Sequence, residues 1–221
     1  MLKTELNLRV IENKDWATIL FVLCLLFVII TKSAFENRFH DFKNLIISER
    51  YIKIYKDYSH LMTWFTFLLF IVQVLSFGFF IQYLFYYFGY SQKWDWLLFI
   101  KIITGLSFFI LAKYLIEKII ATAFDIEEFA EQYNMLKVSY RNYIALLLLP
   151  ITIILFYNDK ITTTFLYAIL AIMLFCNLLI YLKGIKIFQK TIIGKLFYFI
   201  LYLCTLEIAP YYFMYYWFTR S

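Results

Sequence analysis

The chain has 221 residues, of which 64% are hydrophobic and 23% aromatic, and its formal net charge is +6. A soluble domain contains about 45–50% apolar residues, so this composition excludes an ordinary soluble protein. With only five Gly and two Pro, and with continuous rather than alternating apolar runs, the sequence argues against a β-barrel. It predicts an all-α, polytopic transmembrane helix bundle.

Six apolar segments are each long enough, with their flanks, to cross a bilayer. We therefore expect one transmembrane domain over residues 16–218, between short polar tails at 1–15 and 219–221. The expected spans are 16–31, 61–90, 96–112, 143–157, 162–182 and 196–218.

The loop at 32–59 is the most basic part of the chain. Phe35, Phe39, Phe42 and Ile46 recur at helical spacing, and Ser48 is placed to cap a second short helix. Basic residues on one face and aromatic residues on the other predict amphipathic helices lying in the cytoplasmic headgroups. The alternative is a docking surface for a partner protein.

Polar residues interrupt the second and third spans. Gln73 is expected to form a hydrogen bond between helices, with a ligand-binding role as the alternative. Lys101 lies in the outer half of the third span. Its ammonium either reaches the near interface along the flexible side chain or forms an ion pair with Glu207 of the last span.

The third span is expected to continue as an amphipathic helix beyond residue 112, and Asp125 with Glu128 resembles a capping box for the next helix. Glu127, Glu128 and Glu131 are read as a solvated acidic face in preference to a metal site. No metal or cofactor is expected anywhere in the chain.

The fourth span contains Pro150, where a helix kink is predicted, and the fifth contains Asn177 near its far end. The last span holds Glu207, an acidic residue near the middle of the bilayer. A carboxylate there costs about 2.5–3.5 kcal/mol on insertion scales, so it is a functional candidate. The alternative is a structural role, in which a neutral Glu207 forms a hydrogen bond with Gln73 of a neighbouring helix or with the carbonyl of Leu206. Pro210 should kink this helix, and Tyr211 shares a face with Glu207.

Charge distribution predicts the orientation of the chain. Loops one, three and five carry six, four and four Lys and Arg residues, fourteen together, whereas the two tails and loops two and four carry six. Because cytoplasmic loops are enriched in Lys and Arg, loops one, three and five are expected in the cytoplasm and both termini in the periplasm. In a membrane protein this charge excess indicates such loops, and no nucleic-acid partner is expected.

Three stretches resemble a known family. The closing motif at 201–210, LYLCTLEIAP, is similar to that of an uncharacterised family of polytopic inner-membrane proteins of the Bacteroidota, catalogued as a domain of unknown function. The stretches 50–55 and 146–150 resemble the family in the same order. The chain departs from it at Ala209, where a large aliphatic residue is usual, and in the aromatic residues at 211–213. The resemblance implies a bacterial inner-membrane protein without an established activity.

Three function hypotheses remain open. Because no phosphate-binding loop, nucleophile–base pair or metal cluster is recognisable, the first is a non-enzymatic subunit or assembly factor that binds a membrane-protein partner or forms a homo-oligomer. The alternative is a transporter or proton-coupled component centred on Glu207. The third is an enzyme acting on a lipid-linked substrate through His40, Asp41 or His60, although no spacing among them indicates a reaction.

Overall fold

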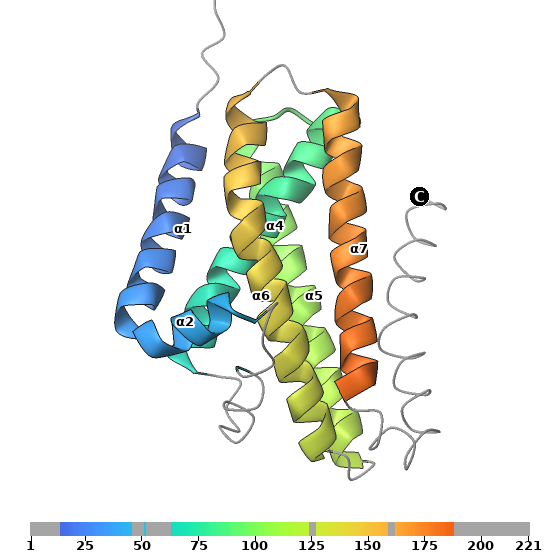
Figure 1. The fold of residues 1–221 in the computed structure, drawn as a ribbon. Coiled ribbons are helices and arrows are strands. Elements are labelled where there is room, and N and C mark those ends of the chain that lie inside the picture. The colour runs from blue at the N-terminus through green and yellow to red at the C-terminus, as the bar shows by residue number, and fades with distance from the viewer. Residues whose placement is uncertain (1–13, 46–50, 52–62, 124–126, 159–161, 188–221) are drawn as a thin grey trace, which may run out of the picture.

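The fold is all-α, as predicted, in a computed structural model that describes residues 14–45, 51, 63–123, 127–158 and 162–187. Figure 1 shows the long helices side by side at various tilts, with the shorter α2 lying across them. Five helices of the described residues are long and apolar enough to cross a membrane. The sixth predicted span, 196–218, lies outside the described residues. The helices are α1 (Asp15–Ala34), α2 (Glu36–Lys43), α4 (Trp64–Tyr87), α5 (Trp96–Ala123), α6 (Glu127–Tyr157) and α7 (Thr163–Ile187).

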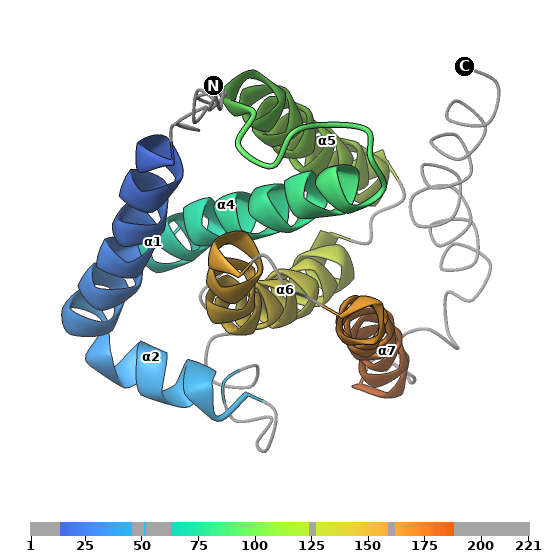
Figure 2. The same cartoon turned by 90° about the horizontal axis from the view of Figure 1, so that it is seen from above.

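Helix α4 lies at the centre of the bundle, between α1, α5 and α6, and α7 packs against α6 (Figure 2). The central position of α4 agrees with its composition, because it is apolar on all sides, and its buried residues are spread over both halves of the helix. A helix without a polar face has to be covered by neighbours or lipid all around. Helices α5 and α6 form a long antiparallel hairpin, and we call the end of the bundle where they are joined the hairpin end.

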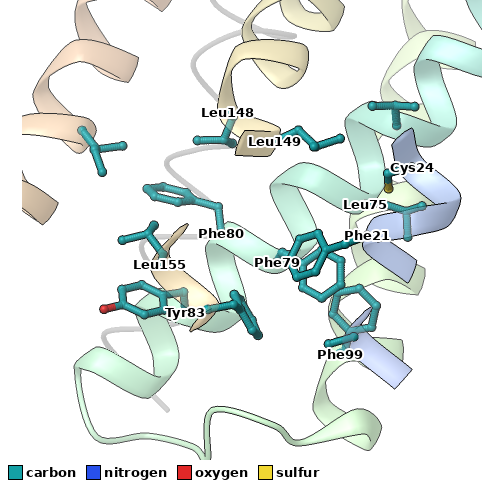
Figure 3. Close-up of a cluster of buried hydrophobic side chains, with 14 of the residues drawn as sticks. Phe21, Cys24, Leu75, Phe79, Phe80, Tyr83, Phe99, Leu148, Leu149 and Leu155 are labelled. Carbon is teal, nitrogen blue, oxygen red and sulfur yellow. The ribbon is translucent and has the colours of Figure 1, made fainter. Parts of the chain in front are cut away.

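Aromatic rings fill the main core. Phe79 of α4 stacks on Phe21 of α1 at a centroid distance of 4.1 Å and on Phe99 of α5 at 4.4 Å, and the edge of Phe156 of α6 meets it at 5.1 Å. Phe79 is fully buried and joins four helices (Figure 3). Stacked and edge-to-face ring pairs stabilise by about 0.5–1.5 kcal/mol each beyond their buried area, so this residue fixes the relative positions of four helices.

Local signals in the sequence define the turn between α4 and α5. Gly89 has a φ of 79°, and the N–H of Tyr90 donates to the carbonyl of Phe85 at 2.9 Å, the pattern of a Schellman motif. Asp95 then caps α5, because its Oδ1 accepts hydrogen bonds from the N–H groups of Leu97 and Leu98 at 3.0 and 3.1 Å.

Two helices extend beyond their predicted spans. Helix α5 has 28 residues and α6 has 31, which correspond to about 42 and 46 Å at 1.5 Å per residue. A hydrocarbon core of about 30 Å leaves two to three turns of each helix outside it. Helix α6 begins at Glu127, close to the helix start predicted from Asp125 and Glu128, and continues without a break into the span expected from Tyr143, because residues 127–142 contain no Pro or Gly that would end a helix.

Helix α2 packs on the bundle with its aromatic side. Phe42 is only 2% exposed, and its ring lies 5.7 Å from that of Phe65 on α4 and 5.8 Å from that of Tyr143 on α6. The amphipathic pattern of the first loop therefore covers protein in the folded chain, and the aromatic face does not lie free in the headgroups. The predicted second helix after Ser48 lies outside the described residues.

Candidate functional site

A buried ion pair joins the two helices of the hairpin. The Nζ of Lys137 on α6 donates to Oε1 of Glu117 on α5 at 2.9 Å, and both side chains are only 4% exposed. The ring of Tyr133, one turn from Lys137, lies 4.8 Å from the same ammonium. Taking two charges out of water is costly, and mutual attraction with further contacts offsets that cost.

A second buried cation lies beside this pair. Lys113 is 8% exposed and stands one turn before Glu117 on α5. Asn134 of α6 is 5% exposed, and its Oδ1 has no hydrogen-bond partner within the described part of the chain. We call Lys113, Glu117, Tyr133, Asn134 and Lys137 the hairpin cluster. Together these five residues carry two ammonium groups and one carboxylate.

The hairpin cluster lies far from the opposite ends of α5 and α6. Glu117 is 21 residues from the start of α5 and Lys137 is 20 residues from the end of α6, which places each about 30 Å along its helix. This distance equals the thickness of a hydrocarbon core. A hydrocarbon core that begins at the opposite ends of α5 and α6 would therefore end at the level of the pair.

Further polar contacts at the hairpin end join α7 and the first loop to α6. The ammonium of Lys183 on α7 donates to the hydroxyl of Tyr140 at 3.2 Å, and that hydroxyl donates to the carbonyl of Leu45 at 3.3 Å. On α2, the guanidinium of Arg38 donates to the hydroxyl of Thr63 at 2.9 Å and lies 4.7 Å from the ring of Phe65.

A second cluster of polar contacts lies at the end of the bundle opposite the hairpin end. The ammonium of Lys93, a residue only 5% exposed, lies 5.7–5.9 Å from the rings of Tyr83, Tyr86 and Trp94. It also donates to the carbonyl of Asn158 at 3.4 Å. The buried amide of Gln82 donates to the carbonyls of Lys93 at 3.3 Å and Asp95 at 2.9 Å. These contacts hold the turn after α4 against the rest of the bundle.

The described residues that the sequence singled out do not come together in one site. Gln73 is 5% exposed within α4. Asn177 donates from its amide to the carbonyl of Met173 at 2.9 Å, a bond within α7 itself. Lys101 is exposed on α5, and Pro150 lies inside α6, which continues through it. The predicted kink at Pro150 and the interhelical bond of Gln73 stay predictions.

Glu207, Pro210 and Tyr211 lie outside the described residues, and so does the proposed pairing of Lys101 with Glu207. His40 is exposed on α2, whereas His60 also lies outside the described residues. In the segments that the structure describes, there is no group of three His, Cys, Asp or Glu side chains that could hold a metal ion.

The hairpin cluster was not predicted from the sequence. Lys113 and Glu117 looked like part of a charged face of an amphipathic helix, and Lys137 stands 20 residues further along the chain. The sequence did contain one signal. Opposite charges occur on two helices that are joined by a short connection, and each charge lies within three turns of that connection. Antiparallel packing brings such positions together.

Comparison with known proteins gives one match. The profile of a domain of unknown function, DUF4271, matches residues 17–218, which is nearly the whole chain. No curated protein and no solved structure matches the chain. The match covers all the helices described above except the first two residues of α1.

Proposed function

The chain belongs to the DUF4271 family, and on that premise we propose that it is a non-enzymatic subunit or assembly factor of a membrane-protein complex in the bacterial inner membrane. The exposed side of α5 supports this proposal. Lys101, Thr104, Gly105 and Phe108 are all exposed there, at the i, i+3, i+4 and i+7 spacing of one helix face. We call these four residues the α5 face.

The α5 face combines features that a lipid-facing helix does not need. Phe108 is 74% exposed, and no heavy atom lies within 4 Å of the position that a Cβ on Gly105 would occupy. Small residues let a second helix approach closely, and a threonine hydroxyl can donate across the contact. Phe108 would then pack against the body of that helix.

Lys101 indicates the chemistry of the partner. It is five residues from the start of α5, about 7–8 Å along the helix axis, so its Cα lies inside the hydrocarbon core. A lysine there can extend to the near interface, or it can form an ion pair with a carboxylate at the same depth. We assign the α5 face to a transmembrane helix of another protein that carries such a carboxylate.

The test is affinity purification of the tagged chain from its native membrane in mild detergent, followed by mass spectrometry of the proteins that remain bound. A stoichiometric partner is expected with the wild type and is lost in Gly105→Leu, because the larger side chain keeps the helices apart. Ala171→Leu, the same type of change at an exposed position on α7, serves as the control. A chain that purifies alone in every case contradicts the proposal.

We also propose that the hairpin end faces the cytoplasm. The charge count over the loops supports this orientation, and five of the cations in that count lie at the hairpin end among the described residues: Arg38, Lys113, Lys137, Arg141 and Lys183. Single cysteines at Lys118 and Gln92, two exposed positions at opposite ends, test it. A membrane-impermeant maleimide added to intact cells with a permeable outer membrane should label only the cysteine at position 92.

The transporter hypothesis centred on Glu207 stays a separate prediction. Glu207→Gln keeps the size and hydrogen bonding of the side chain but cannot carry a proton. A strain with this variant that retains full function would remove the proton-carrying role without affecting the proposed complex.

A further inference from the structure

The ammonium of Lys183 is held in a fixed place at the hairpin end. It donates to the Tyr140 hydroxyl at 3.2 Å and lies 5.2 Å from the centroid of the Tyr140 ring. Tyr140 is only 6% exposed and is itself fixed by its bond to the carbonyl of Leu45. Lys183 remains partly exposed, so a positioned charge reaches the surface between α6 and α7.

This charge lies at the level of the membrane boundary. Lys183 is 20 residues from the start of α7, about 30 Å along it, at the same height as the Lys137–Glu117 pair. Arg141 follows Tyr140 directly on α6 and is also partly exposed. The phosphates of a lipid leaflet lie at this height.

The nearby stretches of α5, α6 and α7 carry more positive than negative charge. In the stretches 108–123, 133–148 and 175–187, Glu117 is the only acidic residue, and it is engaged by Lys137. The cations of the same stretches whose side chains the structure describes are Lys113, Lys118, Lys137, Arg141 and Lys183. A surface of this kind attracts phosphate groups, each neighbouring Lys or Arg contributing to the attraction.

Below Lys183, α7 carries an apolar stripe. Leu179, Phe175 and Ile172 precede Lys183 by four, eight and eleven residues and are 40%, 59% and 62% exposed. At helical spacing they follow one side of the helix for about 16 Å away from the charge. A fixed cation above an exposed apolar stripe matches the two parts of a phospholipid, its phosphate and its acyl chain.

We propose that Lys183 and Arg141 bind the phosphate of an anionic phospholipid, with one acyl chain lying along Leu179, Phe175 and Ile172 of α7. This inference does not depend on the proposed complex, because the α5 face lies on another helix. It also does not require a particular orientation in the membrane, since both leaflets present phosphates at the required depth.

The experiment is native mass spectrometry of the purified full chain in detergent micelles during titration with phosphatidylglycerol or with phosphatidylcholine. The wild type should retain phosphatidylglycerol preferentially, and the preference should weaken as salt is raised. A cation near an anionic headgroup contributes about 1 kcal/mol, which corresponds to about a fivefold change in affinity. Lys183→Gln should therefore lose about fivefold, and the double variant with Arg141→Gln about 25-fold.

Matched variants separate the possible outcomes. Lys14→Gln removes an exposed charge at the opposite end of the bundle and should leave lipid retention unchanged, whereas Lys183→Arg should preserve it. Inorganic phosphate and glycerophosphoglycerol, added instead of lipid, test whether a free anion suffices; competition by either at equal concentration would contradict a lipid site. Equal retention of the two phospholipids by the wild type would overturn the proposal even if a variant failed to fold.

Discussion

Replacing Glu117 with leucine leaves two buried ammonium groups, those of Lys113 and Lys137, without the carboxylate that lies 2.9 Å from Lys137. At that distance and an effective dielectric constant of 20, the Coulomb attraction within the pair is about 6 kcal/mol, most of which offsets the cost of removing the charges from water. Breaking a buried pair typically destabilises by about 3–5 kcal/mol. We expect Glu117→Leu to fall in that range.

Because Lys113 is close to the ion pair, we expect the loss of stability to differ between substitutions of Glu117 and of Lys137. Lys137→Met leaves Glu117 one turn from Lys113, which still attracts the carboxylate, so this variant should lose less stability than Glu117→Leu. The double variant removes both charges and should recover to within about 1.5 kcal/mol of the wild type, because apolar replacement of a buried pair is often close to neutral.

The assay is reversible unfolding in mixed micelles with increasing SDS, arranged as a double-mutant cycle. Lys118→Met, which removes an exposed charge next to Glu117, is the control and should change stability by less than about 0.5 kcal/mol. If Glu117→Leu were no more destabilising than this control, or if the double variant were the least stable of the set, our account of the hairpin cluster would be wrong.

Three further predictions concern packing and the turn after α4. Phe42→Ala should destabilise by about 3–5 kcal/mol in the same unfolding assay, because its ring fills the contact between α2, α4 and α6, whereas Phe67→Ala, at a position 51% exposed, should have little effect. Gly78→Leu should cost about 1–3 kcal/mol or more, since a Cβ there would lie 3.1 Å from Cγ1 of Ile103; an unchanged melting temperature would contradict the close approach of α4 and α5. Gln82→Leu removes the donor to the carbonyls of Lys93 and Asp95, and each carbonyl left unpaired costs about 1–3 kcal/mol of stability. The turn at 88–95 should therefore be cleaved faster by protease than in the wild type.

The helical fold follows from the sequence because lipid permits few alternatives for long apolar runs. Local signals also set some boundaries: Asp95 caps α5, and Gly89 provides the left-handed residue that ends α4. The pair Asp125 and Glu128 predicted a helix start, and α6 begins at Glu127. Hydropathy did not indicate that this helix continues into the span expected from residue 143, because Arg141 and Asn142 resemble the polar edge of a span. A charged residue does not end a helix, and α6 runs through both.

Contacts between distant residues were harder to predict than the helices themselves. Whether Lys137 is buried depends on Glu117 facing it across the hairpin, and hydropathy treats each residue separately. The same reason explains why the aromatic side of α2 suggested a lipid-facing helix: the pattern is identical whether the apolar partner is lipid or protein. Phe42 meets protein only because α4 and α6 supply Phe65 and Tyr143 at that height.

The position of α2 has a consequence for synthesis of the chain. The carbonyl of Leu45 accepts its hydrogen bond from Tyr140, which is translated 95 residues later. At about 5–20 residues per second, the ribosome adds those residues in roughly 5–20 s. During that interval the aromatic side of α2 has no α6 to pack against, and an amphipathic helix can rest in the headgroups instead. The aromatic face that packs on α4 and α6 in the folded protein therefore also suits α2 to bind the membrane surface until α6 has been synthesised.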